Sequence, residues 1–247
     1  MRVEHAELSL QGARDTNQDR VGAEVTGEAA LLIACDGMGG HEEGERAAAI
    51  ALQVIGQRFR ATPQPLLDPL GFLHLSLGAA HQQIVSIGAE IPLENRPRAT
   101  IALCLVQRGS AYWAHVGDSR TYHLRRGRVV ARTRDHSHVE LLVREGVIGA
   151  EQAHNHPMRN FVESCLGGEV LLPEMDVSRR QPIEADDVLL VCTDGLWAGV
   201  SDEAIAAAFA QSGTPINEAL AALCAQAVAA SGSSCDNTSA VALRYLE

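Results

Sequence analysis

The sequence lacks a long apolar run and a segment that resembles an export signal. None of its apolar stretches reaches the roughly 18 residues that a membrane-spanning helix needs. The first ten residues, Met1 to Leu10, carry scattered charges and no continuous apolar core, which argues against a secretory signal. We therefore expect a protein that has no membrane partner.

Cysteine pairs at metal-binding or redox spacing are also missing. None of the six cysteines forms a C-x-x-C pair, and four of them lie inside apolar segments. This distribution is typical of small buried hydrophobic residues in a reducing compartment. It predicts a cytoplasmic location.

An excess of basic residues is missing as well. The chain has 20 Lys and Arg against 31 Asp and Glu, a formal net charge of -11. Such a surface repels nucleic-acid phosphates, and no Lys/Arg stripe reverses the effect. The composition therefore argues against a nucleic-acid partner, whereas carboxylates in such numbers are suitable ligands for hard cations.

No repeat, low-complexity tract or long linker interrupts the 247 residues, and this length suffices for one well-packed core. We therefore predict a single domain over residues 1–247. Continuous apolar runs predict buried strands at Ala30–Cys35, Ala99–Val106, Ala111–Val116, Val188–Thr193 and Ser239–Tyr245. Apolar spacing and capping residues predict helices over Glu42–Arg60, Leu66–Gly88, Ser201–Gln211 and Thr214–Ser231. Short turns between strands favour antiparallel pairing, so the fold class is α+β.

Three of the predicted strands lead directly into an aspartate. These are Asp36, Asp118 and Asp194, and a fourth, Asp236, stands just before the last strand. Carboxylates brought together at strand ends repel one another where water is scarce, and divalent cations relieve that repulsion. An Asp-Gly pair is also a common turn, so this pattern alone leaves a turn and a shared metal site as equal alternatives.

Eight short motifs then follow one another along the chain. They are Gly12–Asp19, Asp36–His41, Arg98–Thr100, Gly117–Arg120, Arg134–Ser137, His156–Asn160 with Leu166-Gly167, Thr193–Trp197 and Asp236–Thr238. In this order they resemble the metal-dependent protein phosphatases of type 2C, in particular their short, single-domain bacterial branch. The resemblance implies a four-layer α-β-β-α fold, in which helices flank a central sandwich of two antiparallel sheets.

The resemblance also implies a binuclear metal centre at one end of the sandwich. Asp36 would bridge the two ions, the carbonyl oxygen of Gly37 would join one of them, and Asp194 and Asp236 would hold the other. Asp118 with Asp194 matches the place where bacterial members bind a weaker third ion.

Three further residues acquire roles from the resemblance. Arg14 would grip the phosphate of the substrate and act in catalysis together with Asp36, Asp194 and Asp236. Asp19 would orient metal-bound water, and Asn237 would help to hold the ligand residues in place without binding an ion itself. A ligand set made only of oxygen suits Mg²⁺ or Mn²⁺ better than Zn²⁺. Two such ions can lower the pKa of a water molecule and stabilise the oxygens of an in-line displacement.

Two positions depart from the family's eukaryotic members. Met38 stands where those members carry a histidine that has been assigned as general acid, and Gln18 stands where a glutamate is common. His41 follows shortly after Met38, and we expect it to have a structural role at the start of a helix.

Several residues have a plainer interpretation. Asp118 could cap a turn and pair with Arg120, and Trp197 is expected to pack in the core. The histidine pairs His136/His138 and His154/His156 are interpreted as loop residues, because no third ligand stands at a spacing typical of zinc. The segment 135–168 corresponds to the family's variable flap, which could contact a protein substrate or simply pack on the domain.

The predicted function is hydrolysis of phosphoserine and phosphothreonine in proteins, opposing a serine/threonine kinase. A phosphatase of small phosphate esters is the alternative. A non-catalytic binding relative is disfavoured, because Asp36, Asp118, Asp194 and Asp236 are all present. A monomer is the default expectation.

Overall fold

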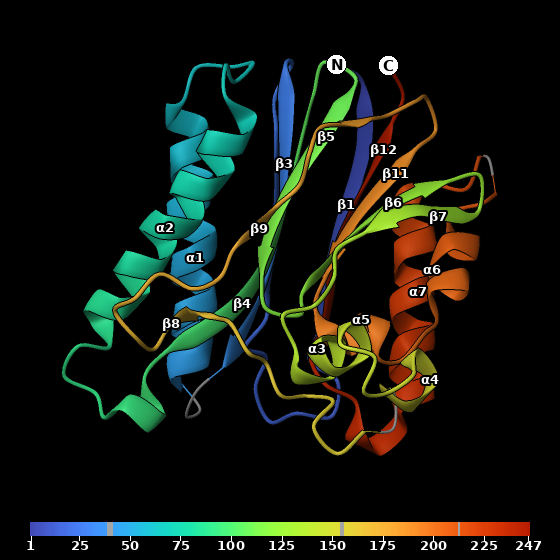
Figure 1. Cartoon of the computed structure of the whole chain (residues 1–247). Helices are drawn as coiled ribbons and strands as arrows, with labels where there is room; N and C mark the ends of the chain where they lie inside the picture. The colour runs from blue at the N-terminus through green and yellow to red at the C-terminus, as the bar shows by residue number, and fades with distance from the viewer. Residues whose placement is uncertain (39–41, 154–155, 212) are drawn as a thin grey trace.

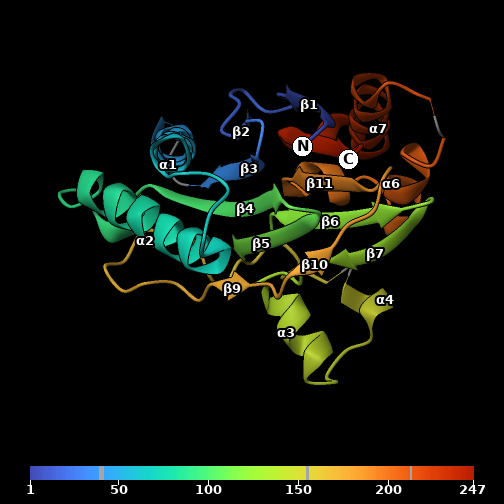
Figure 2. The same cartoon turned by 90° about the horizontal axis from the view of Figure 1, so that it is seen from above.

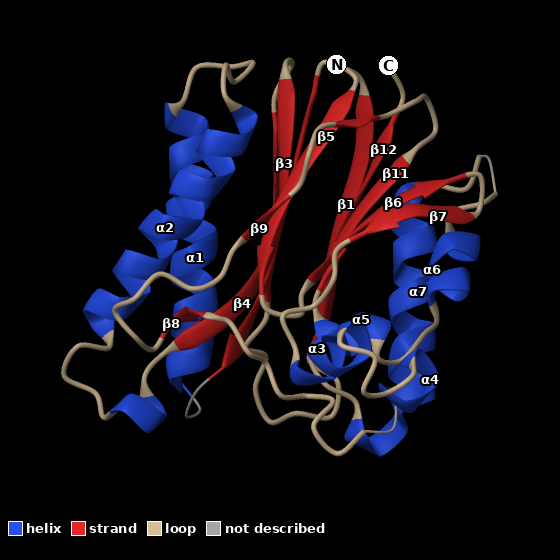
Figure 3. Ribbon diagram, in the orientation of Figure 1, coloured by secondary structure: helices blue, strands red, loops and turns tan. Residues whose placement is uncertain are grey.

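The computed structural model describes residues 1–38, 42–153, 156–211 and 213–247. Two antiparallel sheets stack face to face, and helices cover the outer face of each (Figures 1 and 3). The arrangement is the predicted four-layer α-β-β-α sandwich, so the predicted fold class is confirmed.

The first sheet joins the two ends of the chain. Its strand order is β1 (Val3–Leu10), β12 (Thr238–Tyr245), β11 (Val188–Cys192), β6 (Arg120–Arg125) and β7 (Arg128–Arg132). β1 pairs with β12 along its whole length, from Val3 opposite Tyr245 to Leu10 opposite Thr238. The two termini therefore lie side by side at the top of Figure 1.

The second sheet is built around the longest buried strands. Its order is β10 (Gln181–Pro182), β5 (Ser110–Val116), β4 (Arg98–Gln107), β3 (Ala29–Met38) and β2 (Arg20–Val25). Two short strands lie off this path, because β8 (Leu166–Gly167) pairs with β4 and β9 (Asp176–Val177) pairs with β5.

Helices close both sides of the sandwich (Figure 2). α1 (Glu42–Ala61) and α2 (Pro69–Ile87) cover the second sheet, and α6 (Asp202–Ala208) and α7 (Ile216–Ser231) cover the first. α3 (His138–Arg144) and α4 (Ala150–Ala153) project from the sandwich, and α5 (Asp194–Trp197) directly follows β11. Among the helices of the described residues, none has the length and apolar composition needed to cross a bilayer.

Strand β3 shows why the predicted strands read as continuous apolar runs. Its residues Leu31, Ile33 and Cys35 pack against the helices, whereas Leu32 and Ala34 pack between the two sheets. Because both faces of the strand are buried, the alternation of a half-exposed strand is absent. None of the six cysteines is in a disulfide.

Several boundaries differ from the prediction. β3 continues through Asp36 and Gly37 to Met38, so this Asp-Gly pair lies inside a strand and is not a turn. α2 begins at Pro69 rather than Leu66, because the side chain of Asp68 accepts a hydrogen bond from the N–H of Gly71 and caps the helix there. α6 ends at Ala208, three residues before the predicted end.

Candidate metal centre

A cleft of about 500 Å³ lies at one end of the sandwich and brings the predicted ligands together. All five of them line it, namely Asp36, Gly37, Asp118, Asp194 and Asp236. Arg14 and Asn237 line the same cleft. These residues come from opposite ends of the sequence and from both sheets, so the sandwich itself creates the site.

Gly37 allows β3 to approach α1 closely. A Cβ atom at this position would lie 2.1 Å from the backbone oxygen of Gly44 and 2.8 Å from that of Gln18. Only glycine fits between these two segments, and the side chain of the preceding residue, Asp36, reaches the cleft.

A second close approach places Asp194 near Asp236. Asp194 is the first residue of α5, so the second Asp-Gly pair opens a helix and is not a turn either. A Cβ atom on Gly195 would lie 2.1 Å from the backbone oxygen of Asn237. The start of α5 therefore packs directly on the segment that carries Asp236.

The carboxylates in the cleft are electrostatically strained in the absence of a cation. Burial, and then the neighbouring carboxylates, raise the pKa of Asp36 and of Asp194 well above the ordinary range. Burial is also the main cause that raises the pKa of Asp118 to about 7 and that of Asp19 to about 6. Each of these groups would be more stable as an anion if a divalent cation lay beside it.

Unsatisfied oxygen atoms give a second reason to place cations here. Oδ1 of Asp19 and Oδ1 of Asp118 are buried, and within the described part of the chain neither has a hydrogen-bond partner. Buried polar atoms are normally paired, so two orphaned acceptors indicate missing donors or metal ions. The donor set consists of oxygen atoms, and therefore these residues fit Mg²⁺ or Mn²⁺.

Arg14 lies at the rim of the cleft. Its guanidinium Nη2 is 2.5 Å from Oδ2 of Asp236, and its side chain is 60% exposed. This hydrogen bond, together with the charges of Asp236, Asp194 and Asp36, raises the pKa of Arg14. Arg14 thus stays charged, faces the carboxylates and remains accessible to a ligand.

Asn237 and Asp19 hold the segments of the cleft together. The amide of Asn237 donates to the backbone oxygens of Gln11 (2.8 Å) and Thr16 (3.0 Å), and its oxygen accepts from the N–H of Gln18 at 2.9 Å. Oδ2 of Asp19 accepts a 2.8 Å hydrogen bond from the hydroxyl of Thr193. The loop that carries Arg14 is thereby attached to the segments that carry Asp236 and Asp194.

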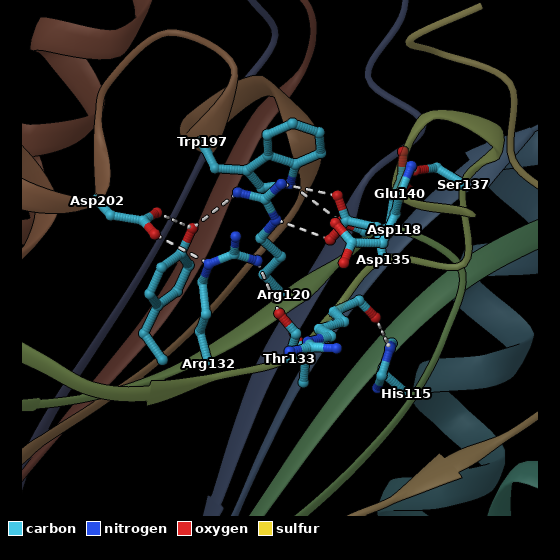
Figure 4. A network of polar contacts seen from close by, with 12 residues as sticks. His115, Asp118, Arg120, Arg132, Thr133, Asp135, Ser137, Glu140, Trp197 and Asp202 are labelled. Atoms are coloured by element: carbon cyan, nitrogen blue, oxygen red, sulfur yellow. Dashed lines mark hydrogen bonds and ion pairs between the residues drawn. The ribbon is translucent and has the colours of Figure 1, made fainter. Parts of the chain in front are cut away.

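The environment of Asp118 differs from the plainer interpretation of the sequence. Arg120 does not pair with Asp118, because its Nε and Nη2 donate to both oxygens of Asp135 at 2.8 and 2.7 Å (Figure 4). Trp197 does pack against the core, as predicted, but its indole N–H also donates to the backbone oxygen of Asp118 at 3.0 Å. The motifs Gly117–Arg120 and Arg134–Ser137 were the sequence signal for this network, although their pairing was not predicted.

The segment 135–168 borders the cleft. Two of its residues, Asn160 and Val162, line the cavity, and Phe161 between them is 49% exposed. Val162 also forms an isolated β-bridge with Ser137, which closes the base of the segment. Gly39, Gly40, His41 and His154, which entered the sequence predictions, lie outside the described residues.

Three residues that the sequence did not connect gather at the base of this segment. His136 stacks on His115 with ring centroids 4.5 Å apart, and its Nε2 lies 3.5 Å from the carboxylate of Asp176. Nδ1 of His136 accepts the N–H of Gly117 at 3.2 Å, so the neutral ring carries its proton on Nε2. A protonated nitrogen and nearly parallel rings are a poor arrangement for sharing a metal ion, so we interpret this cluster as structural.

Comparison with known proteins identifies the family. A family model for protein phosphatase 2C matches residues 11–229. The chain is 34% identical over 193 residues to the serine/threonine protein phosphatase PstP of Mycobacterium tuberculosis. The matched region covers 78% of this chain and 36% of PstP. The chain thus spans about a third of the length of PstP. It is 32% identical over 200 residues to the serine/threonine phosphatase stp of Listeria welshimeri, covering 78% and 77% of the two chains.

Solved structures agree over the whole chain. The serine/threonine phosphatase of S. agalactiae superposes with a TM-score of 0.89 at 28% identity and covers 100% of both chains. The catalytic domain of PstP, solved in complex with two manganese ions, has a TM-score of 0.83 at 29% identity and covers 99% of both chains. The family match, the fold and the acidic cleft lead to one conclusion: the chain belongs to the protein phosphatase 2C family.

Proposed function

We propose that this chain is a metal-dependent phosphatase that removes phosphate from serine and threonine in proteins. The observation that carries the proposal is the cluster of mutually repelling carboxylates, the half-buried Asp36 and Asp194 and the buried Asp118, with exposed Arg14 at its rim. Two ions, Mn²⁺ or Mg²⁺, would be held by Asp36, the carbonyl of Gly37, Asp194 and Asp236, and a third by Asp118 with Asp194. Two manganese ions bound to the catalytic domain of PstP support this assignment.

The residues of the chain would divide the work in the following way. The ions, when bound, supply an activated water nucleophile and neutralise charge on the transferring phosphoryl group. Arg14 binds the phosphoryl oxygens with its planar guanidinium, whose fork matches two of them at once. Asp19 would orient metal-bound water through its buried oxygen Oδ1, which has no hydrogen-bond partner among the described residues, whereas its other oxygen accepts from Thr193. Asn237 keeps the Arg14 loop at a constant distance from the carboxylates.

The substrates would be proteins that a cognate serine/threonine kinase has phosphorylated. The phosphatase would act on them in the cytoplasm. The relatives PstP and stp are both named serine/threonine phosphatases, and this supports the substrate class. The exposed side chains of the segment 135–168 beside the cleft, such as Phe161, offer a surface on which a protein substrate could lie. Residues 1–247 would act as one catalytic domain.

A direct comparison of substrates tests the proposal. The full chain is freed of metal, reloaded with Mn²⁺, and assayed on phosphoserine and phosphothreonine peptides and on a panel of small phosphate esters. We expect kcat/KM for the peptides to exceed that for the small esters by about tenfold or more. A clear preference for a small ester would assign the chain to small-molecule hydrolysis, and activity on neither class would indicate a binding protein.

A further inference from the structure

Trp197 connects two carboxylates of the cleft that come from different parts of the chain. It is the last residue of α5, and Asp194 is the first. Its indole Nε1–H donates a 3.0 Å hydrogen bond to the backbone oxygen of Asp118. The pairing of β6 with β11, in which Arg120 lies opposite Cys192, brings the ends of these strands together, and the indole hydrogen bond joins the backbone of Asp118 to the single helical turn that begins at Asp194.

The indole is itself held in place by a buried ion pair. The guanidinium carbon of Arg120 lies 3.6 Å from the ring centroid, a cation–π contact. Arg120 binds Asp135 through two parallel hydrogen bonds, and the two side chains are only 13% and 6% exposed. Nη1 of Arg120 also donates to the hydroxyl of Tyr122 at 3.1 Å. A guanidinium held by three hydrogen bonds to two residues restricts the orientation of the indole that it covers.

The backbone next to Asp118 is fixed by the base of the segment 135–168. The N–H of His136 donates to the oxygen of Gly117 at 2.9 Å, and the N–H of Gly117 donates to Nδ1 of His136. In contrast, Oδ1 of the Asp118 carboxylate has no hydrogen-bond partner among the described residues. The backbone of Asp118 is bound from α5 by the indole N–H of Trp197.

We propose that Trp197 is a positioning residue for the cation held between Asp118 and Asp194. Its N–H does not touch the ion and acts through the backbone of Asp118, and Arg120 with Asp135 keeps the indole oriented. The inference rests on the proposed function, since it concerns the third of the three cations assigned there. It predicts that this site weakens when the indole N–H is lost, whereas the sites at Asp36 and Asp236 do not change.

Cation binding to the metal-freed full chain tests this without any substrate. Isothermal titration with Mn²⁺ compares wild type, Trp197→Phe, Trp113→Phe and Asp118→Asn. Trp113, the other tryptophan, lies in the core between the sheets. The variant Trp113→Phe also loses an indole N–H and is therefore the matched control. We expect Trp197→Phe to weaken the low-affinity site about fivefold, the value of one net hydrogen bond, and to leave the tight sites unchanged. Asp118→Asn should abolish the low-affinity site, and Trp113→Phe should match wild type.

A fluorescence titration gives an answer even if Trp197→Phe folds poorly. In Trp113→Phe the single remaining tryptophan is Trp197, and Mg²⁺ does not quench fluorescence by paramagnetism. The emission of Trp197 should change at the Mg²⁺ concentrations that fill the low-affinity site. Adding Asp118→Asn to the Trp113→Phe variant should remove this response. An emission change that follows only the tight sites would overturn the proposal, as would equal weakening of all sites in Trp197→Phe.

The outcome is separable from that of the proposed function. A chain that hydrolyses no phosphopeptide but shows the Trp197-dependent site would overturn the function and keep this inference. An active phosphatase whose low-affinity site is identical in wild type and Trp197→Phe would overturn this inference alone.

Discussion

The side-chain amide nitrogen of Asn237 lies 3.0 Å from the backbone oxygen of Thr16 and donates a hydrogen bond to it. The two residues are 221 positions apart, and Asn237 directly follows Asp236. The contact therefore attaches the loop that carries Arg14 to the segment that carries a candidate metal ligand. This explains how an exposed arginine can have a defined position relative to the carboxylates of the cleft.

Asn237→Ala should loosen that loop. The variant loses three hydrogen bonds at a side chain that is 5% exposed, so we expect a loss of about 2–3 kcal/mol in the free energy of unfolding. Because Arg14 is then poorly placed, KM for a phosphopeptide should rise by about tenfold. Urea unfolding and steady-state kinetics measure the two effects. Asn95→Ala, at an exposed turn, is the control and should change neither. An unchanged KM would show that the loop needs no such attachment.

Removal of one carboxylate from the cleft should have opposite effects on stability and activity. The raised pKa of Asp36 and of Asp194 means that each charge destabilises the metal-free fold. Asp36→Asn and Asp194→Asn should therefore raise the Tm in EDTA, reduce the Tm increase caused by Mn²⁺, and lower activity by about a hundredfold or more. Asp15→Asn, an exposed residue of the same cleft, should do none of these. Full turnover in EDTA after dialysis would end the metal hypothesis.

Arg14→Ala should raise KM more than it lowers kcat. A guanidinium that binds phosphate acts in the ground state as well as in the transition state, so its loss is felt mainly in binding. Arg14→Lys should recover only part of the loss, because a lysine cannot bind two oxygens in a fork. Arg128→Ala, on the edge strand β7, serves as the charge-matched control. If kcat/KM for phosphopeptides stayed at the wild-type value, Arg14 would be misassigned.

Cysteine should not take part in the chemistry, although Cys35 adjoins Asp36. Burial, with Asp19 and Asp36 nearby, raises the pKa of Cys35, so the thiolate is scarce at neutral pH. Cys35→Ala should keep kcat within about tenfold of wild type. In the native protein a thiol reagent should modify Cys165 first, because it is the most accessible of the six. Rapid modification of Cys35, or a collapse of kcat in Cys35→Ala with metals still bound, would argue for a thiol mechanism.

Acid stability should depend on Asp187, at the start of β11 away from the cleft. Burial acts to raise the pKa of Asp187, but hydrogen bonds from Arg125, the N–H of Glu184 and His123 outweigh it and lower the pKa. A lowered pKa stabilises the fold above the ordinary pKa of about 3.9, and the gain is lost as pH falls further.

Urea unfolding from pH 3 to 7 measures this effect. Asp187→Asn should cost about 3 kcal/mol at pH 7, because it leaves Arg125 and His123 with a neutral partner. The difference from wild type should shrink below about pH 4. Asp186→Asn, its exposed neighbour, should behave as wild type throughout. A difference between Asp187→Asn and wild type that stays constant from pH 3 to 7 would contradict the assignment.

The strands that the sequence predicted are those buried on both faces. β3, β4, β5, β11 and β12 are continuous apolar runs because helices or sheets cover both of their sides. β1, β6 and β7 were not predicted, because charged and polar residues such as Glu4, Arg125 and Arg128 interrupt their apolar pattern. Their strand conformation comes from pairing with neighbours, which local sequence does not encode.

The chemistry of the cleft was predicted from the sequence, through its pattern of aspartates and its resemblance to the family. Aspartates after apolar strands, in motifs whose order resembles that of the family, indicated an oxygen-rich cation site before any coordinates, whereas the close approaches at Gly37 and Gly195 are seen only in the structure. What only the tertiary structure decided is which groups touch. Arg120 pairs with Asp135 rather than Asp118, and Trp197 reaches the backbone of Asp118 across 79 positions. Such contacts, and the raised pKa values of the carboxylates, depend on distances between segments far apart in sequence, which only packing of the two sheets brings together.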